Sequence, residues 1–369
     1  MKKIKVLQMP IRNAKGGITQ YALRNWDYID KTRFSFDWAT LDAKLSFEDE
    51  LIQQGCKVHH ISCRQETDEA HFRREMADIF SVGYDVIHLH TSFWRGFLAE
   101  ELAIKAGIPR IIVHAHSTGI DHADPNEREM LINAHEKWKS QFNTKLATHF
   151  AACSTLAADF LYSPKIPKEQ IIILKNAIDT DKFAYNQKTR EQLRYNMGLD
   201  GKFVLLMVAR LEYQKNHSFA LKVFADVVKA TPNAVLLLAG DGKLRDSLEK
   251  EAAELGITQS IRFLGFRDDV QVLLQGADLM LVPSLFEGFS ISTIEAQCTG
   301  IYCCCSCHIP DEAIILDSAV RLPLDVKLWR DTIVNIARTG YVRRNRSKEV
   351  VAAGFSLKKQ IKLLEGMYL

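Results

Sequence analysis

Short apolar runs alternate with amphipathic segments along the whole chain, and this alternation constrains the fold more than any other feature of the sequence. The first series of runs occupies residues 4–9, 58–61, 86–89, 110–113 and 171–174. A second series occupies residues 203–208, 234–239, 261–264, 279–282 and 301–305. Continuous apolar strands between helical patterns are typical of parallel sheets that are covered on both faces. The sequence therefore predicts an α/β protein with two doubly wound, Rossmann-like domains.

The two predicted domains meet near residues 175–179, after which the chain turns polar, as a connector does. The first domain is placed at residues 1–178 and the second at residues 179–354. Residues 355–369 form an amphipathic helix with one apolar side. A chain of 369 residues is longer than one hydrophobic core usually supports, which agrees with two domains.

The composition excludes several classes of protein. The net charge is only +3 and the charges are balanced in both halves, so nucleic acid is a poor candidate partner. No apolar run approaches the roughly 18 residues of a membrane-spanning helix, and the N-terminus lacks the pattern of a signal sequence. The eight cysteines do not form a spaced disulfide framework. We therefore expect a cytoplasmic protein.

Cysteine and histidine are unevenly distributed. Residues 303–307 contain four cysteines directly before His308, but zinc ligands usually come as separated pairs, so we predict a buried strand of small residues rather than a metal site. Ten of the twelve histidines lie in residues 1–178, which suggests a polar, catalytic rim on the first domain. Four of them are predicted to be ordinary surface residues: His59, His60, His71 and His135.

Two carboxylates, Glu287 and Glu295, stand eight positions apart where a loop enters a helix. With the helix starting near Ser290, they differ by roughly 12 Å along its axis, more than the ~5 to 9.5 Å of a glycoside hydrolase pair. They could instead hold opposite ends of an elongated ligand whose anionic centre lies on the helix N-terminus, such as a nucleotide-diphospho-sugar. The structural alternative is a capping box formed by Ser292 and Glu295.

Other polar motifs follow strands of the first domain, at the edge where ligands of parallel sheets collect. Gly16 and Gly17 let the backbone approach a ligand closely, although an ordinary tight turn is the alternative. We expect His114 and His116 to point to opposite faces where the strand ends. We favour His116 for the ligand side and a core position for His114, with His88 and His90 as a weaker repeat of the same arrangement.

The second domain carries similar motifs. Arg210 and Lys215 follow its first strand and can supply two cations to a diphosphate, with a solvated surface pair as the alternative. The next strand ends in Gly240-Asp241-Gly242, a turn that exposes backbone. The third ends in Leu264-Gly265-Phe266, where the backbone could bind a base edge or simply leave the strand.

These motifs, in this order, resemble those of the family-4 retaining glycosyltransferases with the GT-B fold. The match covers nearly the whole chain and is strongest over residues 209–300. Within the family the chain looks most like bacterial capsular and exopolysaccharide transferases, given residues 176–179 and 214–217. The motifs that carry the resemblance are the Gly16-Gly17 loop, His116, the Arg210/Lys215 pair, Gly240-Asp241-Gly242, residues 263–270 and the Glu287-x7-Glu295 signature.

The resemblance implies two domains that face each other across a cleft, an acceptor-side first domain to which the terminal helix returns, and a second domain that binds a nucleotide sugar. It implies that Glu295 holds the ribose, that Glu287 and the Gly288–Ile291 backbone hold the sugar, and that His116 faces the reacting sugar. The expected catalytic residues are His116, Glu287, Arg210 and Lys215. The expected donor-binding residues are Gly16, Gly17, Arg210, Lys215, Gly240, Leu264, Gly265, Phe266, Gly288, Phe289, Ser290, Ile291 and Glu295.

Two positions depart from the family pattern. Ala209 stands where many members have glycine, which should be tolerated if the residue is extended. Residues 301–307 replace a strand of Gly-Xaa-Pro-Val type by the cysteine-rich run. Because of this second departure, the sequence does not assign the side of the donor site nearest the nucleotide base.

We therefore expect a retaining, metal-independent transfer of a hexose or N-acetylhexosamine from a UDP-sugar to a saccharide acceptor, in particular a lipid-linked one, without a cofactor. Asp179-Thr180-Asp181 has the pattern of metal-dependent transferases, but at a connector we expect its aspartate to be a cap. Lys137, Trp138, Lys139, Phe142 and Lys145 suit a membrane surface, or else a solvated helix with buried aromatic residues. The alternatives are a nucleotide-sugar epimerase or phosphorylase, or a non-catalytic subunit of a polysaccharide assembly.

Overall fold

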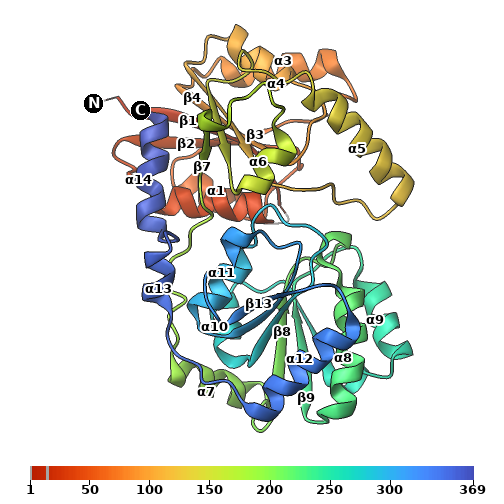
Figure 1. The fold of residues 1–369 in the computed structure, drawn as a ribbon. Coiled ribbons are helices and arrows are strands. Elements are labelled where there is room, and N and C mark those ends of the chain that lie inside the picture. The colour runs from red at the N-terminus through yellow and green to blue at the C-terminus, as the bar shows by residue number, and fades with distance from the viewer. Residues whose placement is uncertain (1, 14–15) are drawn as a thin grey trace. The chain divides into compact units, whose positions relative to one another are not determined.

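The structure is a computed structural model that describes residues 2–13 and 16–369. The chain forms two compact units (Figure 1). Unit 1 comprises Met1–Ile120, Asp124–Asn176 and Leu357–Leu369, and unit 2 comprises Asp121–Ala123 and Ala177–Ser356. Lys15, which precedes the Gly16-Gly17 motif, lies outside the described residues.

Unit 1 is built on a seven-stranded sheet in the order β3-β2-β1-β4-β5-β6-β7, with every pairing parallel. Its strands are β1 (Ile4–Ile11), β2 (Phe34–Thr40), β3 (Val58–His60), β4 (Val86–Thr91), β5 (Arg110–Ala115), β6 (His149–Ala152) and β7 (Ile171–Ile173). Its helices are α1 (Gly17–Tyr28), α2 (Glu48–Gln53), α3 (Glu69–Phe80), α4 (Leu98–Lys105), α5 (Pro125–Lys139), α6 (Thr155–Leu161) and α14 (Leu357–Tyr368).

Unit 2 repeats the plan with a six-stranded parallel sheet in the order β10-β9-β8-β11-β12-β13. Its strands are β8 (Phe203–Val208), β9 (Ala234–Ala239), β10 (Ile261–Gly265), β11 (Leu279–Val282), β12 (Tyr302–Ser306) and β13 (Ala319–Leu322). Its helices are α7 (Gln187–Asn196), α8 (His217–Ala230), α9 (Arg245–Glu254), α10 (Val270–Gly276), α11 (Ile291–Cys298), α12 (Val326–Thr339) and α13 (Ser347–Ala352). The predicted pair of doubly wound domains is confirmed.

The apolar runs located most strands and missed three. The strands β2, β6 and β13 are absent from the two predicted series. Ser35 and Asp37 interrupt β2, whose alternate residues Phe34, Phe36 and Trp38 are fully buried. Alternation of this kind is a strand signal in its own right, with period two rather than a continuous run.

The cysteine-rich run forms the buried strand that the sequence predicted. Cys303, Cys304 and Cys305 lie on β12 and are completely buried, whereas Cys307 is exposed beyond its end. Burial raises the pKa of the Cys305 thiol to about 12, so it stays protonated and packs as a small apolar group.

One surface prediction was wrong. His135 lies on α5 and is completely buried, whereas His60 is exposed as expected. The Trp94 backbone N–H donates to His135 Nδ1 at 3.0 Å, and Nε2 lies 3.1 Å from the Phe160 carbonyl. With both ring nitrogens bonded to backbone, the imidazole can be buried without an unpaired polar atom.

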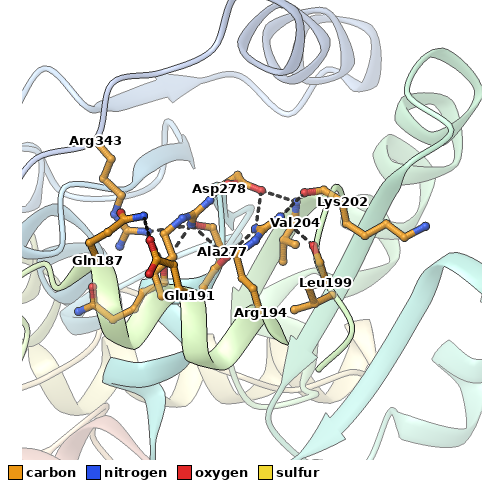
Figure 2. Close-up of polar contacts among 12 residues, drawn as sticks. Gln187, Glu191, Arg194, Leu199, Lys202, Val204, Ala277, Asp278 and Arg343 are labelled. Carbon is orange, nitrogen blue, oxygen red and sulfur yellow. Dashed lines mark hydrogen bonds and ion pairs between the residues drawn. The ribbon is translucent and has the colours of Figure 1, made fainter. Parts of the chain in front are cut away.

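The start of unit 2 is fixed by a cluster of charged residues around Asp278 (Figure 2). Arg190 and Arg194 of α7 both pair with Asp278, whose carboxylate also accepts the Val204 N–H at 2.7 Å. Arg343 donates to the carbonyls of Leu274, Gln275 and Ala277. Cations therefore meet the carbonyl end of α10, where the helix dipole favours them.

The C-terminal helix α14 belongs to unit 1 and lies beside α1, as Figure 1 shows in blue and red. Its apolar side is buried, and two polar contacts fix its position. Gln360 donates to Asn25 Oδ1 at 2.9 Å, and Glu365 accepts the Asp30 N–H at 3.0 Å. Among the described residues, no helix is both long and apolar enough to cross a membrane.

Candidate functional site

In both sheets the strand order reverses beside the first strand of the unit, between β1 and β4 in unit 1 and between β8 and β11 in unit 2. Ligands of open α/β sheets bind beyond the carboxyl ends of the strands at this point. The loops that leave β8 and β11 therefore begin side by side in unit 2.

Hydrogen bonds join the two loops directly. Gln214, in a 3₁₀ turn formed by Tyr213–Lys215, accepts the Leu285 N–H at 2.8 Å on its backbone carbonyl. Its side chain donates to the Phe286 carbonyl at 2.8 Å. Asn216 donates to the Pro283 carbonyl at 3.2 Å. These three bonds hold residues 213–216 against residues 283–287.

Lys215 and Glu287 meet at the centre of this junction. The Lys215 ammonium pairs with the Glu287 carboxylate, which also accepts the Ser284 hydroxyl proton at 2.8 Å. The Glu287 side chain is only 7% exposed and that of Lys215 is 20% exposed. A carboxylate this deeply buried needs such partners, so the pair fixes the position of the ammonium.

Asn216 and His217 complete the first loop. Asn216 adopts the left-handed conformation with φ 57° and is the one non-glycine residue with positive φ among those the structure describes, so Ala209 does not need glycine at its position. His217 is buried at the start of α8, and burial together with the nearby Lys215 lowers its pKa to about 3. The neutral imidazole adds no second cation beside Lys215.

The helix α11 begins directly after the second loop. Its N-cap is Ser290 and Ser292 already lies inside the helix, so the alternative interpretation of Ser292 and Glu295 as a capping box does not hold. Thr293 donates to the Ser290 hydroxyl at 2.7 Å. Phe289 turns its ring inward and stacks on Phe355 with centroids 5.4 Å apart. Residues 288–291 therefore form the N-terminal end of α11.

Glu295 lies on α11 and is 4% exposed. Glu287 lies in the preceding loop rather than on the same helix. The rise along one helix axis therefore does not measure the separation of the two carboxylates. They remain on different elements, which agrees with separate roles.

The glycines at the ends of β9 and β10 are required by backbone packing. A Cβ at Gly240 would lie 1.9 Å from the Ala209 carbonyl oxygen, and one at Gly242 would lie 2.5 Å from that of Leu211. The Gly240 N–H donates to the Gly265 carbonyl at 2.8 Å. The close packing at Gly240 and the left-handed backbone of Gly265, with φ 67°, account for these two glycines without a ligand. Beside them Leu264 is partly buried and Phe266 is 56% exposed.

Arg210 lies immediately beyond β8 and its side chain is 40% exposed. Its guanidinium lies 3.5 Å from the carboxylate of Asp121, another residue of unit 2. The separation is long for a direct hydrogen bond, so the group keeps donors for a second anion.

In unit 1, Gly16 is the N-cap of α1 and Gly17 is its first residue. A Cβ at Gly17 would meet no described atom within 4 Å. Packing therefore does not explain the second glycine, and a close ligand remains one explanation for it.

The histidines of β4 and those at the end of β5 form two hydrogen-bonded pairs. His88 Nε2 lies 3.1 Å from His114 Nδ1, and His90 Nδ1 lies 3.0 Å from His116 Nε2. His114 is completely buried, as predicted, and His116 is half-buried just beyond the strand end. The two ring centroids lie 4.0 Å apart and both rings contact Tyr21, so the expectation that they point to opposite faces is wrong: residues two apart on a strand share a face. Burial lowers the pKa of all four rings, to about 3 for His90, so they are neutral.

Two groups of side chains among the described residues come close enough to suggest a metal: His88 with His90 and His114, and Cys63 with His71 and Glu75. In the first group, both nitrogens of His88 and of His90 are already hydrogen-bonded within unit 1. Asp179 is not in either group; its carboxylate caps a turn by accepting the N–H groups of Asp181 and Lys182.

Sequence reasoning missed three residues of these sites: Ser284, Gln8 and Tyr368. Ser284 directly follows β11 and could have been found by its place at a strand end. Gln8 interrupts the apolar run of β1, and a buried polar residue there is itself a signal. Tyr368 gave no such signal, because it reaches β4 only through the packing of α14.

Comparison with known proteins identifies the class. The model "Glycosyltransferase Family 4" matches residues 15–182, and "Glycosyl transferases group 1" matches residues 189–317. The two matches together span most of the chain and divide it near the boundary between the two units. The chain belongs to the family 4, group 1 glycosyltransferases.

Two relatives illustrate this. EpsF of Bacillus subtilis (strain 168) is 26% identical over 377 residues, covering 96% of this chain and 93% of its own. An Escherichia coli UDP-Gal:alpha-D-GlcNAc-diphosphoundecaprenol alpha-1,3-galactosyltransferase is 23% identical over 298 residues, covering 78% of this chain and 75% of its own.

Solved structures establish the fold as GT-B. HepE of Anabaena in complex with UDP and glucose superposes with a TM-score of 0.77 at 17% identity, over 98% of both chains. WaaG, a glycosyltransferase involved in lipopolysaccharide biosynthesis, superposes with a TM-score of 0.72 at 16% identity, over 99% of both chains.

Replacing Gly240 by alanine should destabilise unit 2. The new Cβ would overlap the Ala209 carbonyl, and Gly240 has φ 151°, so we expect a loss of about 2 kcal/mol or more and a lower melting temperature. Gly366→Ala is the matched control, because it lies on an exposed turn of α14 with nothing within 4 Å. Equal melting temperatures for the two variants would contradict the packing role.

Proposed function

We propose that the protein is a retaining glycosyltransferase that moves a hexose or N-acetylhexosamine from a UDP-sugar to a saccharide acceptor, in particular a lipid-linked one, in capsular or exopolysaccharide synthesis. The observation that carries the proposal is the buried contact of Lys215 with Glu287 at the switch point of unit 2, next to the N-terminal end of α11. Fixed positive charge at this position suits a diphosphate.

In the proposed mechanism, Lys215, Arg210 and the N–H groups at the N-terminus of α11 hold the departing diphosphate. Their positive charge stabilises the negative charge that develops on the phosphate as the bond breaks, so a metal cation is not required. The anomeric carbon develops oxocarbenium character, and the acceptor attacks on the face from which the phosphate leaves, which retains the configuration. The phosphate itself takes the acceptor proton.

In this scheme Glu287 positions Lys215 and binds the sugar, and it is not a nucleophile. Its carboxylate is already bonded to Lys215 and Ser284, so it positions the ammonium and, with the backbone of residues 288–291, binds the sugar. Glu295 is assigned to the ribose, and His116 to a hydroxyl of a sugar substrate.

The donor assignment is supported by what known relatives bind. The E. coli relative is named for UDP-Gal as donor and for a GlcNAc-diphosphoundecaprenol acceptor, and HepE has been solved with UDP-glucose. Both names favour a uridine nucleotide for this chain, and the first favours a lipid-linked acceptor.

The segment of residues 137–145 is less suited to a membrane surface than its sequence suggests. Phe142 is completely buried and stacks on Trp94 with centroids 4.4 Å apart, and Trp138 packs on Phe97 at 5.4 Å. Lys139 donates to the Asp159 carbonyl at 2.8 Å. The aromatic residues thus stabilise unit 1, so we propose that any peripheral contact with a membrane comes through the lipid of the acceptor.

An epimerase or phosphorylase could use the same diphosphate site, and a non-catalytic subunit could retain it. Incubation with donor alone separates these classes, because an epimerase would convert the sugar while a transferase gives only slow hydrolysis. The side chains of Lys215, Glu287 and His116 give the non-catalytic alternative little support.

Lys215→Ala should lower turnover by about two to three orders of magnitude, because removal of one preorganised charge from a leaving group costs roughly 3–4 kcal/mol. The control is Lys222→Ala, an exposed lysine on α8. Melting temperature and transfer rate are measured on both variants. Near-normal turnover in a folded Lys215→Ala protein would refute the diphosphate assignment.

Transfer should proceed at its full rate in excess EDTA, because protein groups supply the positive charge at the leaving phosphate. The measurement is transfer of radiolabelled sugar with and without chelator, followed by addition of Mn²⁺. A loss of activity that Mn²⁺ restores would show that the mechanism needs a metal.

A thermal-shift screen of UDP, GDP and ADP sugars tests the donor. A ligand present at 100 times its Kd stabilises the folded state by about 2.7 kcal/mol, so the true donor should raise the melting temperature clearly. We expect the response with UDP-sugars. A response to GDP-sugars alone would reject the uridine assignment.

A further inference from the structure

A buried hydrogen-bond network connects the C-terminal helix to His116. We call it the histidine network, and all its members belong to unit 1. It starts at Gln8 on β1 and ends in one branch at His116 and in the other at His114. Its members are Gln8, His88, His90, His114, His116 and Tyr368.

With the Gln8 amide as the structure orients it, the hydrogen bonds of the branch to His116 run in one direction. The Gln8 carbonyl oxygen lies 2.8 Å from His90 Nε2, and an amide oxygen only accepts, so Nε2 carries the proton. Burial keeps His90 neutral, which leaves its Nδ1 without a proton. The neighbouring nitrogen, His116 Nε2 at 3.0 Å, must then be the donor.

Tyr368 contacts the other end of the Gln8 amide. The Gln8 amide nitrogen donates to the Tyr368 hydroxyl at 2.9 Å, and that hydroxyl lies 2.8 Å from His88 Nδ1. The hydroxyl accepts from Gln8 and so gives its own proton to His88. His88 then donates from Nε2 to His114 Nδ1 at 3.1 Å. Both branches are consistent with a single orientation of the Gln8 amide.

The rings have little freedom to leave this arrangement. The rings of His114 and His116 contact each other at a tilt, with centroids 4.0 Å apart, and Tyr21 packs edge-on against both, at 5.1 and 5.4 Å. Gln8, His88 and Tyr368 are at most 1% exposed, so water does not compete for their hydrogen bonds.

We propose that Gln8, His90 and Tyr368 are positioning residues that fix His116 as the Nε2–H tautomer, so that its Nδ1 lone pair accepts a hydrogen bond from a hydroxyl of a sugar substrate. The inference rests on the proposed function for the identity of the substrate, but the tautomer is a property of the protein alone. The opposite tautomer would present a donor at Nδ1 and select an acceptor group instead.

The tautomer can be measured without substrate. In protein labelled with ¹⁵N-histidine, two-bond nitrogen–proton correlations identify which ring nitrogen of His116 lacks a proton, with His116→Asn used to assign the signals. We expect Nδ1 of His116 to carry no proton in the unmodified chain. Gln8→Leu removes the amide and should give a mixed or reversed tautomer.

The kinetic arm uses the same variant. Gln8→Leu should lower kcat for transfer about tenfold, the value of roughly one hydrogen bond, while binding of UDP is unchanged. Gln360→Leu is the control: it removes a buried amide of α14 that bonds to Asn25 outside the network, so it should leave the tautomer and kcat unchanged.

The outcomes separate the two claims. A protonated Nδ1 on His116 in the unmodified chain, or an unchanged tautomer in Gln8→Leu, would overturn the inference whatever the activity. An altered tautomer with unaltered kcat would overturn the role of Nδ1 in transfer. If the tautomer is as expected and no nucleotide sugar is ever transferred, the proposed function and the substrate role of His116 fail, while the control of the tautomer stands.

Discussion

The arrangement of this protein depends on one constraint: every strand pairing in both sheets is parallel. Parallel strands place all their carboxyl ends at one edge, and helices must cover both faces to bury the apolar strands. Polar residues that follow different strands are thereby collected without being close in sequence. Residues 213–216 and 283–287 meet in unit 2 for this reason, as do His88, His90, His114 and His116 in unit 1.

Burial of charge and polarity gives these two places different properties. In unit 2 a lysine and a glutamate are buried together, with Ser284 as a third partner. Such a pair adds little net stability, because desolvation offsets the attraction, but breaking it is costly and its geometry is therefore well defined. In unit 1 the buried groups are imidazoles without a carboxylate partner, so desolvation keeps them neutral and their hydrogen bonds acquire a direction. The site in unit 2 therefore presents a charge in a fixed position, and the site in unit 1 presents a lone pair in a fixed position.

Much of the fold was predictable because its signals are local. The runs at residues 203–208, 234–239 and 279–282 coincide with strands, since parallel strands that are covered on both faces are often continuously apolar. Alternating strands such as β2 were missed because their period differs. Glu287, Lys215 and His116 could be proposed as site residues because each follows a strand end. The surface position predicted for His135 was wrong, and the alternative of a capping box at Ser292 does not hold, because both depended on where a helix begins or faces after packing.

The sequence by itself determined the class of fold, the family and the set of polar residues at the strand ends, because periodicity and spacing are properties of the chain. Tertiary structure alone decided which of these residues are partners. It placed Lys215 on Glu287, assigned Gly240 to packing against Ala209, turned Phe289 and Phe142 inward, and brought Tyr368 to Gln8 across 360 positions. The physical reason is that partner choice depends on distance and burial in space, and neither is encoded in the separation of two residues along the chain.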